Sequence, residues 1–318
     1  MPHTAILIAE KGWIPAGVAG AWLRAGNGIA EVWCFAADSP LLRPPRGLIG
    51  RLFPRWDVVR LLARHRVPVR LCPPLKGWHE AAARADAVQA DVLMTLMTHQ
   101  IVPAPLLRHF GGRAVNLHPA LLPDYKGPSP RIGMLLDGQA DLAGGVTLHV
   151  LSPGIDEGPV IASRPVPRSQ ARSYHHWEAL QAVAAGELAG GPLLDYLAGR
   201  LAATPQVPGS GSYRRPTRAE LAIGPAVDAA RARFLCETLG DTGGLHCVGA
   251  GGTIVSLGGF SRHLGLPTGL PPRVGLREVE LDVKDARLRL RRRTPLSKAL
   301  VWARKVEALR SVSARGTA

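Results

Sequence analysis

Short apolar runs alternate with segments of helical spacing over the first two hundred residues, and this alternation constrains the fold more than any other feature. The run T-A-I-L-I-A over Thr4–Ala9 has no charged break, which is typical of a parallel strand buried on both faces. Helices between such strands favour βαβ units. The sequence therefore predicts an α/β fold with a Rossmann-like, mostly parallel sheet.

The elements of this sheet can be placed along the chain from their periodicity. Strands are expected at Thr4–Ala9, Glu31–Ala36, Val67–Leu71, Asp91–Leu96, Ala114–Leu117, Gly145–Leu151 and Val160–Val166. Helices are expected at Val18–Arg24, Trp56–His65, Trp78–Val88, Ala104–Phe110, Arg131–Leu136 and Tyr174–Leu197. The Pro- and Arg-rich segment Ser39–Arg55 is expected to be a mobile basic loop, which either contacts phosphates or is simply solvated.

A stretch rich in Pro, Gly, Ser and Thr at residues 203–220 divides the chain. We expect a first domain at residues 1–202, a linker at residues 203–220, and a smaller, mostly β C-terminal domain at residues 221–318. The second domain is expected to contain helices at Val227–Leu239 and Leu296–Ala314, and strands at Leu245–Val248, Thr253–Leu257, Glu278–Val283 and Ala286–Arg291.

The chain is strongly basic, with 39 Lys and Arg against 24 Asp and Glu and a net charge of +15. Such a field favours a polyanionic or phosphorylated partner, but arginines that only solvate the surface give the same total. The hydrophobic content of 46% excludes a disordered chain, because a disordered chain has fewer apolar residues.

The cysteines and the N-terminus indicate a compartment. The four cysteines have no C-x-x-C spacing, which predicts reduced thiols in a cytoplasmic protein and no zinc site. The first apolar run is followed at once by Glu10 and Lys11, so it is interpreted as a strand and not as a signal peptide. No apolar stretch approaches the roughly 18 residues of a membrane span.

Two separate motifs supply polar groups that could form a reaction centre. Asn116 and His118 lie two residues apart after an apolar run, so their side chains point to the same side at a strand end. Ligands of parallel sheets bind beyond such ends. Asp156 follows in the Gly-rich turn P-G-I-D-E-G-P, where its side chain could instead bond its own backbone. An amide, an imidazole and a carboxylate together can stabilise an oxyanion and move a proton.

Two further segments are candidates for binding. Lys126, Gly127 and Ser129 end a loop and open a helix, which predicts either an anion site or a plain capping turn. The segment Met94–Gln100 leaves the fourth strand and could hold a flat heterocycle, although methionines are more often core residues. The remaining histidines, including His149, His175, His176 and His246, have no useful ligand spacing, and no metal site is expected.

The motif N-L-H-P-A-L-L-P-D-Y-K-G, followed by G-V-T-L-H-V and I-D-E-G-P-V-I-A, resembles the folate-dependent formyltransferases, in particular their two-domain, methionyl-tRNA formyltransferase-like members. The resemblance covers roughly residues 1–200 and is strongest over residues 90–165. It implies formyl transfer from 10-formyltetrahydrofolate to a primary amine, without a metal. It also implies a catalytic trio of Asn116, His118 and Asp156. The folate-binding residues that it implies are Met94, Leu96, Met97, Thr98, Gln100, Gly154, Ile155 and Gly158.

The resemblance leaves the amine acceptor open. A basic second domain and the pattern Gly127-Pro128-Ser129-Pro130 resemble the tRNA-acting members, so methionyl-tRNA is narrowly favoured, with Lys126, Gly127 and Ser129 on the acceptor side. His118-Pro119-Ala120 replaces their usual His-Gly-Ser, and a Gly- and Pro-rich stretch interrupts the second domain. N-formylation of a nucleotide amino sugar or a small amine, an inactive RNA-binding paralogue, and a formyl hydrolase are the alternatives.

Overall fold

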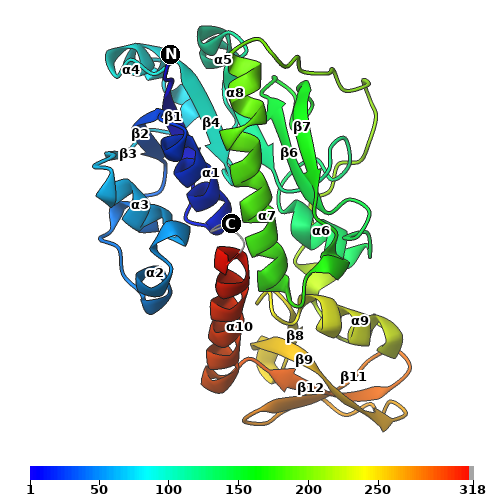
Figure 1. The fold of residues 1–318 in the computed structure, drawn as a ribbon. Coiled ribbons are helices and arrows are strands. Elements are labelled where there is room, and N and C mark those ends of the chain that lie inside the picture. Colours follow the sequence, from blue (N-terminus) through cyan, green and yellow to red (C-terminus); the bar gives the residue numbers. More distant parts are fainter. Residues whose placement is uncertain (315–318) are drawn as a thin grey trace.

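Seven strands form the central sheet of the computed structural model, which describes residues 1–314 (Figure 1). The strands are β1 (Thr4–Ala9), β2 (Gly28–Cys34), β3 (Val69–Leu71), β4 (Val92–Leu96), β5 (Ala114–His118), β6 (Gly145–Val150) and β7 (Val160–Pro165). Their order is β3-β2-β1-β4-β5-β6-β7. The pairs from β3 to β5 are parallel, and β6 and β7 are antiparallel to their neighbours. The predicted mostly parallel sheet is therefore confirmed.

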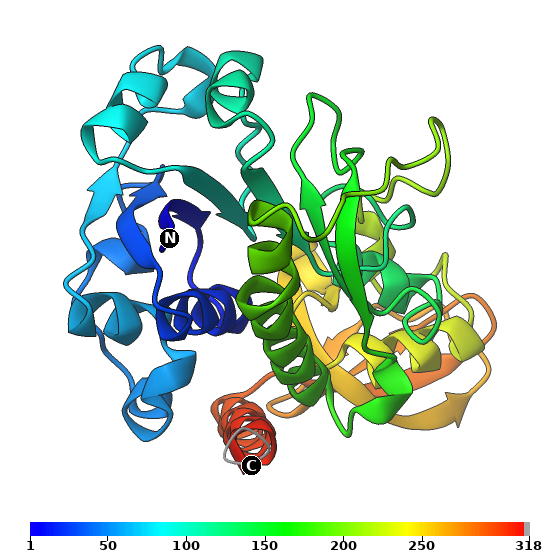
Figure 2. The same ribbon diagram turned by 45° about the horizontal axis from the view of Figure 1, so that its top comes forward.

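Helices cover both faces of this sheet, because side chains of each buried strand alternate between two apolar clusters. Leu7 of β1 belongs to the cluster under α1, α3, α6 and α7, whereas Ile6 and Ile8 belong to the cluster under α4 and α5. The helices are α1 (Trp13–Arg24), α3 (Val58–Arg64), α4 (Ala81–Ala87), α5 (Ala104–Phe110), α6 (Pro130–Leu136), α7 (Tyr174–Gly190) and α8 (Pro192–Leu197). The turned view shows α1 and α7 side by side (Figure 2).

The close contact between α1 and α7 depends on glycine. A Cβ atom on Gly17 would lie 2.3 Å from the carbonyl oxygen of Ala182, and one on Gly186 would lie 2.9 Å from the carbonyl oxygen of Gly17. Two backbones can approach this closely only where no side chain intervenes. The crossing fixes α7 against the sheet and so places the turns that join β6, β7 and α7.

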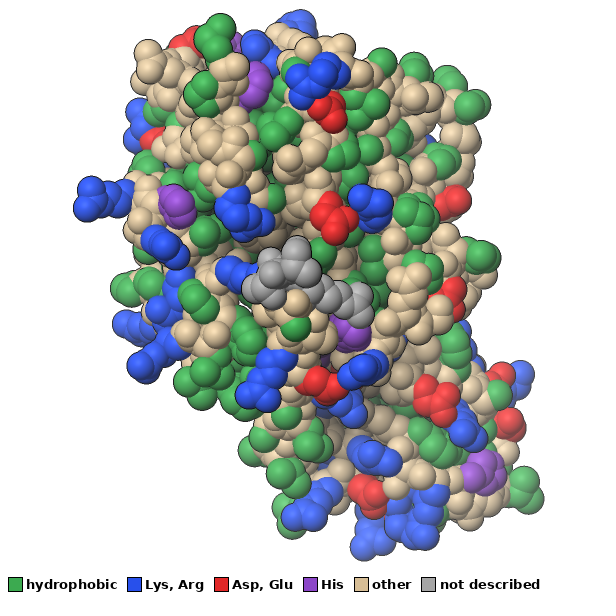
Figure 3. All heavy atoms as spheres, in the orientation of Figure 1, with side chains coloured by type: hydrophobic (Ala, Val, Ile, Leu, Met, Phe, Trp, Pro, Cys, Tyr) green, Lys and Arg blue, Asp and Glu red, His purple; other side chains and the backbone are tan. Residues whose placement is uncertain are grey.

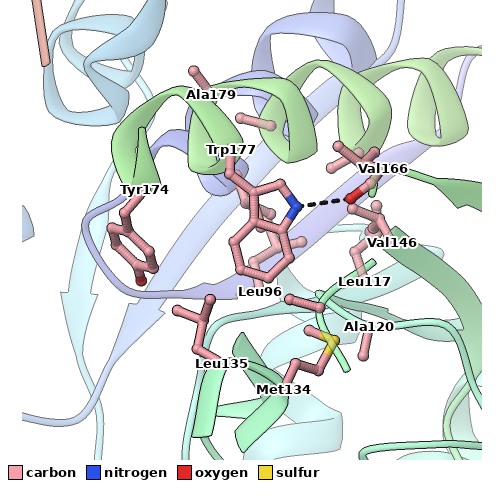
Figure 4. Close-up of a cluster of buried hydrophobic side chains, with 14 of the residues drawn as sticks. Leu96, Leu117, Ala120, Met134, Leu135, Val146, Val166, Tyr174, Trp177 and Ala179 are labelled. Atoms are coloured by element: carbon pink, nitrogen blue, oxygen red, sulfur yellow. Dashed lines mark hydrogen bonds between the residues drawn. The ribbon is translucent and has the colours of Figure 1, made fainter. Parts of the chain in front are cut away.

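Trp177 of α7 packs against this face of the sheet, beside Leu96 of β4 and Leu117 of β5 (Figure 4). The indole is fully buried, and its Nε1–H donates to the carbonyl of Val166 at 2.7 Å. The ring lies among Leu96, Leu117 and Met134, so a large apolar area leaves water while the single polar atom keeps a partner. The strand ends that carry the predicted site therefore have a rigid base.

A second, antiparallel sheet follows residues 203–220. Its strands β8 (His246–Val248), β9 (Ile254–Gly265), β10 (Arg273–Val274), β11 (Glu278–Asp282) and β12 (Arg287–Arg292) lie in the order β10-β11-β12-β9-β8. Helix α9 (Ala229–Leu239) packs on β9. Helix α10 (Pro295–Ala314) returns to α7, as Figure 1 shows, and there the indole of Trp56 donates to Ser313. The predicted smaller, mostly β C-terminal part is confirmed.

Several predicted boundaries were wrong for local reasons. Segment Ser39–Arg55 is not a single loop, because it contains the short helix α2 (Leu48–Leu52). In sequence, Gly258-Gly259 resembles a turn. In the structure, these two glycines lie at a register shift in the pairing of β9 with β12, and β9 continues past Leu257. The helix expected over Tyr174–Leu197 is divided at Gly191, since Pro192 begins a new helix. The 3₁₀ turns are Pro40–Leu42, Pro54–Trp56, Leu75–Gly77, Arg168–Gln170, Ala219–Leu221 and Ala250–Gly252.

Residues 1–314 contain neither a membrane-spanning helix nor a metal-binding cluster. No helix in this range is long and apolar enough to cross a bilayer. No group of three or more His, Cys, Asp or Glu side chains in the same range is arranged to hold a metal ion.

Candidate active site

A row of polar side chains crosses three neighbouring strands. Thr95 of β4 is the register partner of Asn116 of β5, and Asn116 is the partner of His149 of β6. Register partners project from the same face, so the three side chains meet. The Thr95 hydroxyl donates to Asn116 Oδ1 at 2.9 Å, and Asn116 Nδ2 donates to His149 Nε2 at 3.0 Å. These contacts fix the amide with its N–H groups turned away from Thr95.

The proton of His149 can be placed from its partners. Its Nδ1 lies 3.0 Å from the carbonyl oxygen of Val150, which can only accept. Nδ1 therefore carries a proton, and Nε2 is free to accept from Asn116. The ring is almost completely buried, with 1% of its side chain exposed. His149 therefore orients the Asn116 amide from the buried side of the site.

Asp156 joins this row from the turn after β6. Asn116 Nδ2 donates to Asp156 Oδ1 at 3.3 Å, and the backbone N–H of Gly127 donates to Asp156 Oδ2 at 2.9 Å. Burial raises the pKa of Asp156, but the two neighbouring imidazoles, His149 and His118, and the Gly127 amide outweigh it and hold the pKa at about 2. The carboxylate is therefore ionised at neutral pH.

The ring of His118 lies between two acceptors. Its Nε2 is 2.9 Å from the carbonyl oxygen of Tyr125, and its Nδ1 is 3.4 Å from Asp156 Oδ2. Burial lowers the pKa of His118 below its ordinary value, although the Asp156 charge acts in the opposite direction. A neutral ring has one N–H, so one of the two acceptors is left without a proton. The site is therefore built to receive a proton on His118.

The four side chains differ in access to solvent. Asp156 has 13% of its side chain exposed, whereas His118 has 4%. Asn116 is partly buried. Asn116 and Asp156 thus face the open side of the site, and the two imidazoles lie behind them.

Lys126, Gly127 and Ser129 lie on the loop that faces Asp156, but their groups are engaged differently. The Lys126 ammonium is buried and donates to the carbonyl of Ser210 at 2.9 Å. Ser129 precedes α6 in a left-handed conformation and makes no side-chain cap. Gly127 supplies its backbone N–H to Asp156. Of the three, only Gly127 bonds a member of the trio.

The segment predicted to hold folate divides into buried and accessible parts. Met94 and Leu96 are fully buried in the core. The chain leaves β4 at Met97, which has a left-handed φ of 58°. Thr98 Oγ1 accepts from the Gln100 backbone, and Gln100 Oε1 accepts from the Leu75 backbone at 3.3 Å. The side chains after Leu96 are therefore the ones that can meet a ligand.

The turn at residues 154–158 carries Asp156 itself. Ile155 exposes 44% of its surface, and the carbonyl of Gly154 accepts from the Ser152 hydroxyl. The carbonyl of Gly158 accepts from Gln206 Nε2 at 2.8 Å. An exposed Ile beside buried charges is the apolar surface that a flat ring could cover.

A separate cavity of about 690 Å³ lies between α1, α7 and the end of α10. It is lined by small residues such as Ala16 and Ala184, together with Arg24, Arg55 and Val312. None of its lining residues belongs to the trio or to the predicted folate segments.

The sequence predictions gave no individual role to Thr95, His149 or Gln206, although Thr95 lies within the predicted ligand segment Met94–Gln100. His149 was judged to have no useful spacing, yet it contacts Asn116 directly. The sequence feature that could have indicated His149 is its position as a polar residue inside the apolar strand G-V-T-L-H-V, the next strand after the one that carries Asn116. To infer that His149 contacts Asn116, one must know the register of β5 against β6, and the spacing of residues along the chain does not give that register.

Comparison with protein families agrees with this geometry. A model described as formyl transferase matches residues 63–178, a range that contains Thr95, Asn116, His118, His149 and Asp156. Over these residues the chain is similar to the formyl transferase family. Every member of the polar row and the carboxylate beside it therefore lies within the residues that match this family.

Curated relatives match a part of the chain. A methionyl-tRNA formyltransferase from Listeria monocytogenes is 34% identical over 129 residues, which are 41% of this chain and 41% of the relative. One from Roseiflexus is 36% identical over 118 residues, or 37% of this chain and 35% of the relative. The chain thus matches less than half the length of each of these relatives.

Solved structures share the fold over a longer range. A sugar N-formyltransferase from Shewanella sp FDAARGOS_354 superposes with a TM-score of 0.60 at 15% identity, over 83% of this chain and 99% of that protein. A variant of HypX from Aquifex aeolicus gives 0.60 at 14% identity, over 91% of this chain and 45% of that protein. At such identities the likeness concerns the fold alone.

Proposed function

We propose that the chain transfers a formyl group from 10-formyltetrahydrofolate to a primary amine. The observation that supports this most is the meeting of an amide, an imidazole and an ionised carboxylate at the ends of β5 and β6, within the residues that match the formyl transferase family. Amine attack on a formyl carbon needs an oxyanion donor and a proton acceptor. The site offers both within one cluster.

Asn116 is proposed to stabilise the oxyanion. One of its N–H groups bonds Asp156 Oδ1 at 3.3 Å, a longer contact than the one to His149. As negative charge develops on the formyl oxygen, this N–H can also donate to it, while Thr95 and His149 keep the amide plane fixed. The donor is therefore oriented before the reaction, which lowers the barrier.

His118 is proposed to receive the amine proton and return it to the departing folate nitrogen. Asp156 cannot do this itself, because a carboxylate with a pKa of about 2 is a weak base at neutral pH. Its charge instead stabilises the protonated ring of His118. In balance, the amine nitrogen bonds the formyl carbon, the carbon–folate nitrogen bond breaks, and the proton moves from one nitrogen to the other.

Two segments are proposed to hold the folate. Residues after Leu96, namely Met97, Thr98 and Gln100, would form one wall, whereas the predicted Met94 and Leu96 are core residues. The turn with Gly154, Ile155 and Gly158 would form the other. The exposed Ile155 side chain and the left-handed turn at Met97 fit a flat ring between them.

The acceptor is narrowly proposed to be methionyl-tRNA, bound by the basic second domain, residues 221–318. Identity to methionyl-tRNA formyltransferases supports this choice. One observation favours the alternative, a nucleotide amino sugar or a small amine. Several arginines of the second domain are already paired: Arg287 with Asp282, Arg289 with Glu280, and Arg304 with Asp241. On the face in Figure 3, Lys and Arg are spread along the molecule.

An acceptor screen tests the function. The full chain is mixed with 10-formyltetrahydrofolate labelled in the formyl group, and with charged initiator tRNA, nucleotide amino sugars or small amines. We expect the label to appear on one class of amine, and methionyl-tRNA is the acceptor that we favour. Label on formate alone would indicate a hydrolase, and no release of label with any acceptor would contradict the proposal.

The rate is expected to fall in acid. His118 must be neutral to accept a proton, and burial lowers its pKa below the ordinary imidazole value. kcat, corrected for the unprotonated fraction of the amine, should be constant above that value and fall about tenfold per pH unit below the lowered pKa. Asp156, with a pKa of about 2, stays ionised throughout. A corrected rate that still rises above pH 7 would contradict this role of His118.

A further inference from the structure

We infer that residues 204–214, which the sequence marks as a linker, position Asp156 and so complete the active site. This inference rests on the proposed function, because it assigns a role within the same site. The segment contacts both loops that meet at Asp156. Gln206 holds the turn that carries Asp156, and the stretch from Ser210 to Arg214 holds the loop that carries Gly127.

Gln206 bonds the Asp156 turn through a single atom. Its Nε2 donates to the carbonyl of Asp156 and to the carbonyl of Gly158, both at 2.8 Å. Thr204, two residues earlier, exchanges both backbone hydrogen bonds with Val160 at 2.8 Å. A side-chain amide nitrogen has two N–H groups, so glutamine satisfies two carbonyls of one turn at once.

The same segment fixes the opposite loop. The backbone of Lys126 donates to Ser212 at 2.8 Å and accepts from Arg214 at 2.9 Å. A Cβ atom on Gly127 would lie 2.6 Å from the ring of Tyr213, and the φ of Gly127 is 97°. Only glycine fits between this ring and Asp156. The Gly127 N–H therefore points at Asp156 Oδ2 because the segment holds the loop there.

Asp156 needs this support because its backbone is strained. Its φ of 56° lies in the left-handed region, which side chains other than glycine adopt at a cost. Such a conformation persists only where its surroundings impose it. Gln206 holds the Asp156 carbonyl, and Gly127 holds its carboxylate. Displacing a catalytic group by about 1 Å can reduce a rate by two orders of magnitude.

The segment is itself anchored. Arg214 makes two hydrogen bonds of 3.0 Å to the two carboxylate oxygens of Asp137, at the end of α6, and also pairs with Glu220. These contacts raise the pKa of Arg214 and hold the pKa of Glu220 at about 2. The segment is thus attached to the part of the chain that carries the site before the chain enters the second sheet.

Two variants of Gln206 test this positioning role. Gln206→Met removes both donors, and we expect kcat to fall at least about tenfold while the dissociation constant of the folate changes little. Gln206→Glu places a carboxylate against two carbonyls, so it should be slower still at neutral pH. As the pH falls, protonation restores one donor, and the activity of Gln206→Glu relative to the unaltered protein should rise. The matched control is Gln170→Met, an exposed glutamine outside the site.

Protection of the Gly127 amide against hydrogen exchange supplies a readout that does not depend on activity. We expect Gly127 to lose protection in Gln206→Met and to keep it in Gln170→Met. If the unaltered protein transfers no formyl group but protection is lost, the proposed function fails and the positioning role stands. Unchanged kcat and unchanged protection in Gln206→Met would overturn the inference. So would equal losses in both variants, or a Gln206→Glu activity that shows no relative gain in acid.

Discussion

Replacing His118 with alanine is expected to lower the rate of formyl transfer by at least about two orders of magnitude. The substitution removes the group placed to accept the amine proton, and it leaves Asp156 as an ionised carboxylate that is too weak a base to replace it. It also removes the partner of the Tyr125 carbonyl. The measurement is the single-turnover rate with labelled 10-formyltetrahydrofolate and the acceptor that the screen identifies.

Folate binding separates a catalytic loss from a damaged fold. His118 is buried behind Asn116 and Asp156, so its removal should change the folate dissociation constant by no more than a few-fold. His65→Ala, at an exposed histidine that ends α3, is the control and should keep the full rate. Near-normal turnover in His118→Ala would refute the assignment.

Replacing Asp156 with asparagine is the second large expected effect, again about two orders of magnitude or more. Asparagine keeps the shape and can still accept from the Gly127 N–H, but it carries no charge to stabilise protonated His118. The Asp156 charge raises the pKa of His118, so its removal should lower that pKa further. The acid limb of the rate profile should therefore move to lower pH, while the plateau falls.

The pH profile distinguishes this role from simple loss of structure. A variant that is only partly folded would lose rate at every pH without moving the acid limb. The profile of Asp156→Asn is compared with that of Glu157→Gln, which changes the exposed neighbouring carboxylate. A profile for Asp156→Asn with an unshifted or raised pKa would mean that Asp156 does not act through His118.

The part of the site that could be predicted from sequence is the part that depends on local geometry. Asn116 and His118 share a side because alternation along a strand is a property of the backbone. Glycine and proline on both sides of Asp156 predict the turn that carries it. His149 could not be predicted in this way, because its contact with Asn116 depends on the pairing of β5 with β6.

The segment at residues 203–220 shows the limit of composition as a guide. Its Pro, Gly and Ser content predicted a linker, and that content is compatible with an ordered path as well as with a free one. The contacts that order it join residues about eighty positions apart, such as Lys126 with Ser210 and Tyr125 with Ser212. Likewise, β9 continues through Gly258-Gly259 because its partner β12 supplies hydrogen bonds.

The most direct test is a double-variant cycle on the labelled formyl transfer rate, using His118→Ala, Asp156→Asn and the two combined. If the side chains form one reaction centre, the unaltered protein places label on an amine, and the double variant is no more than a few-fold slower than His118→Ala. Losses that multiply in the double variant would contradict this account, as would an unaltered protein that delivers no label to any amine.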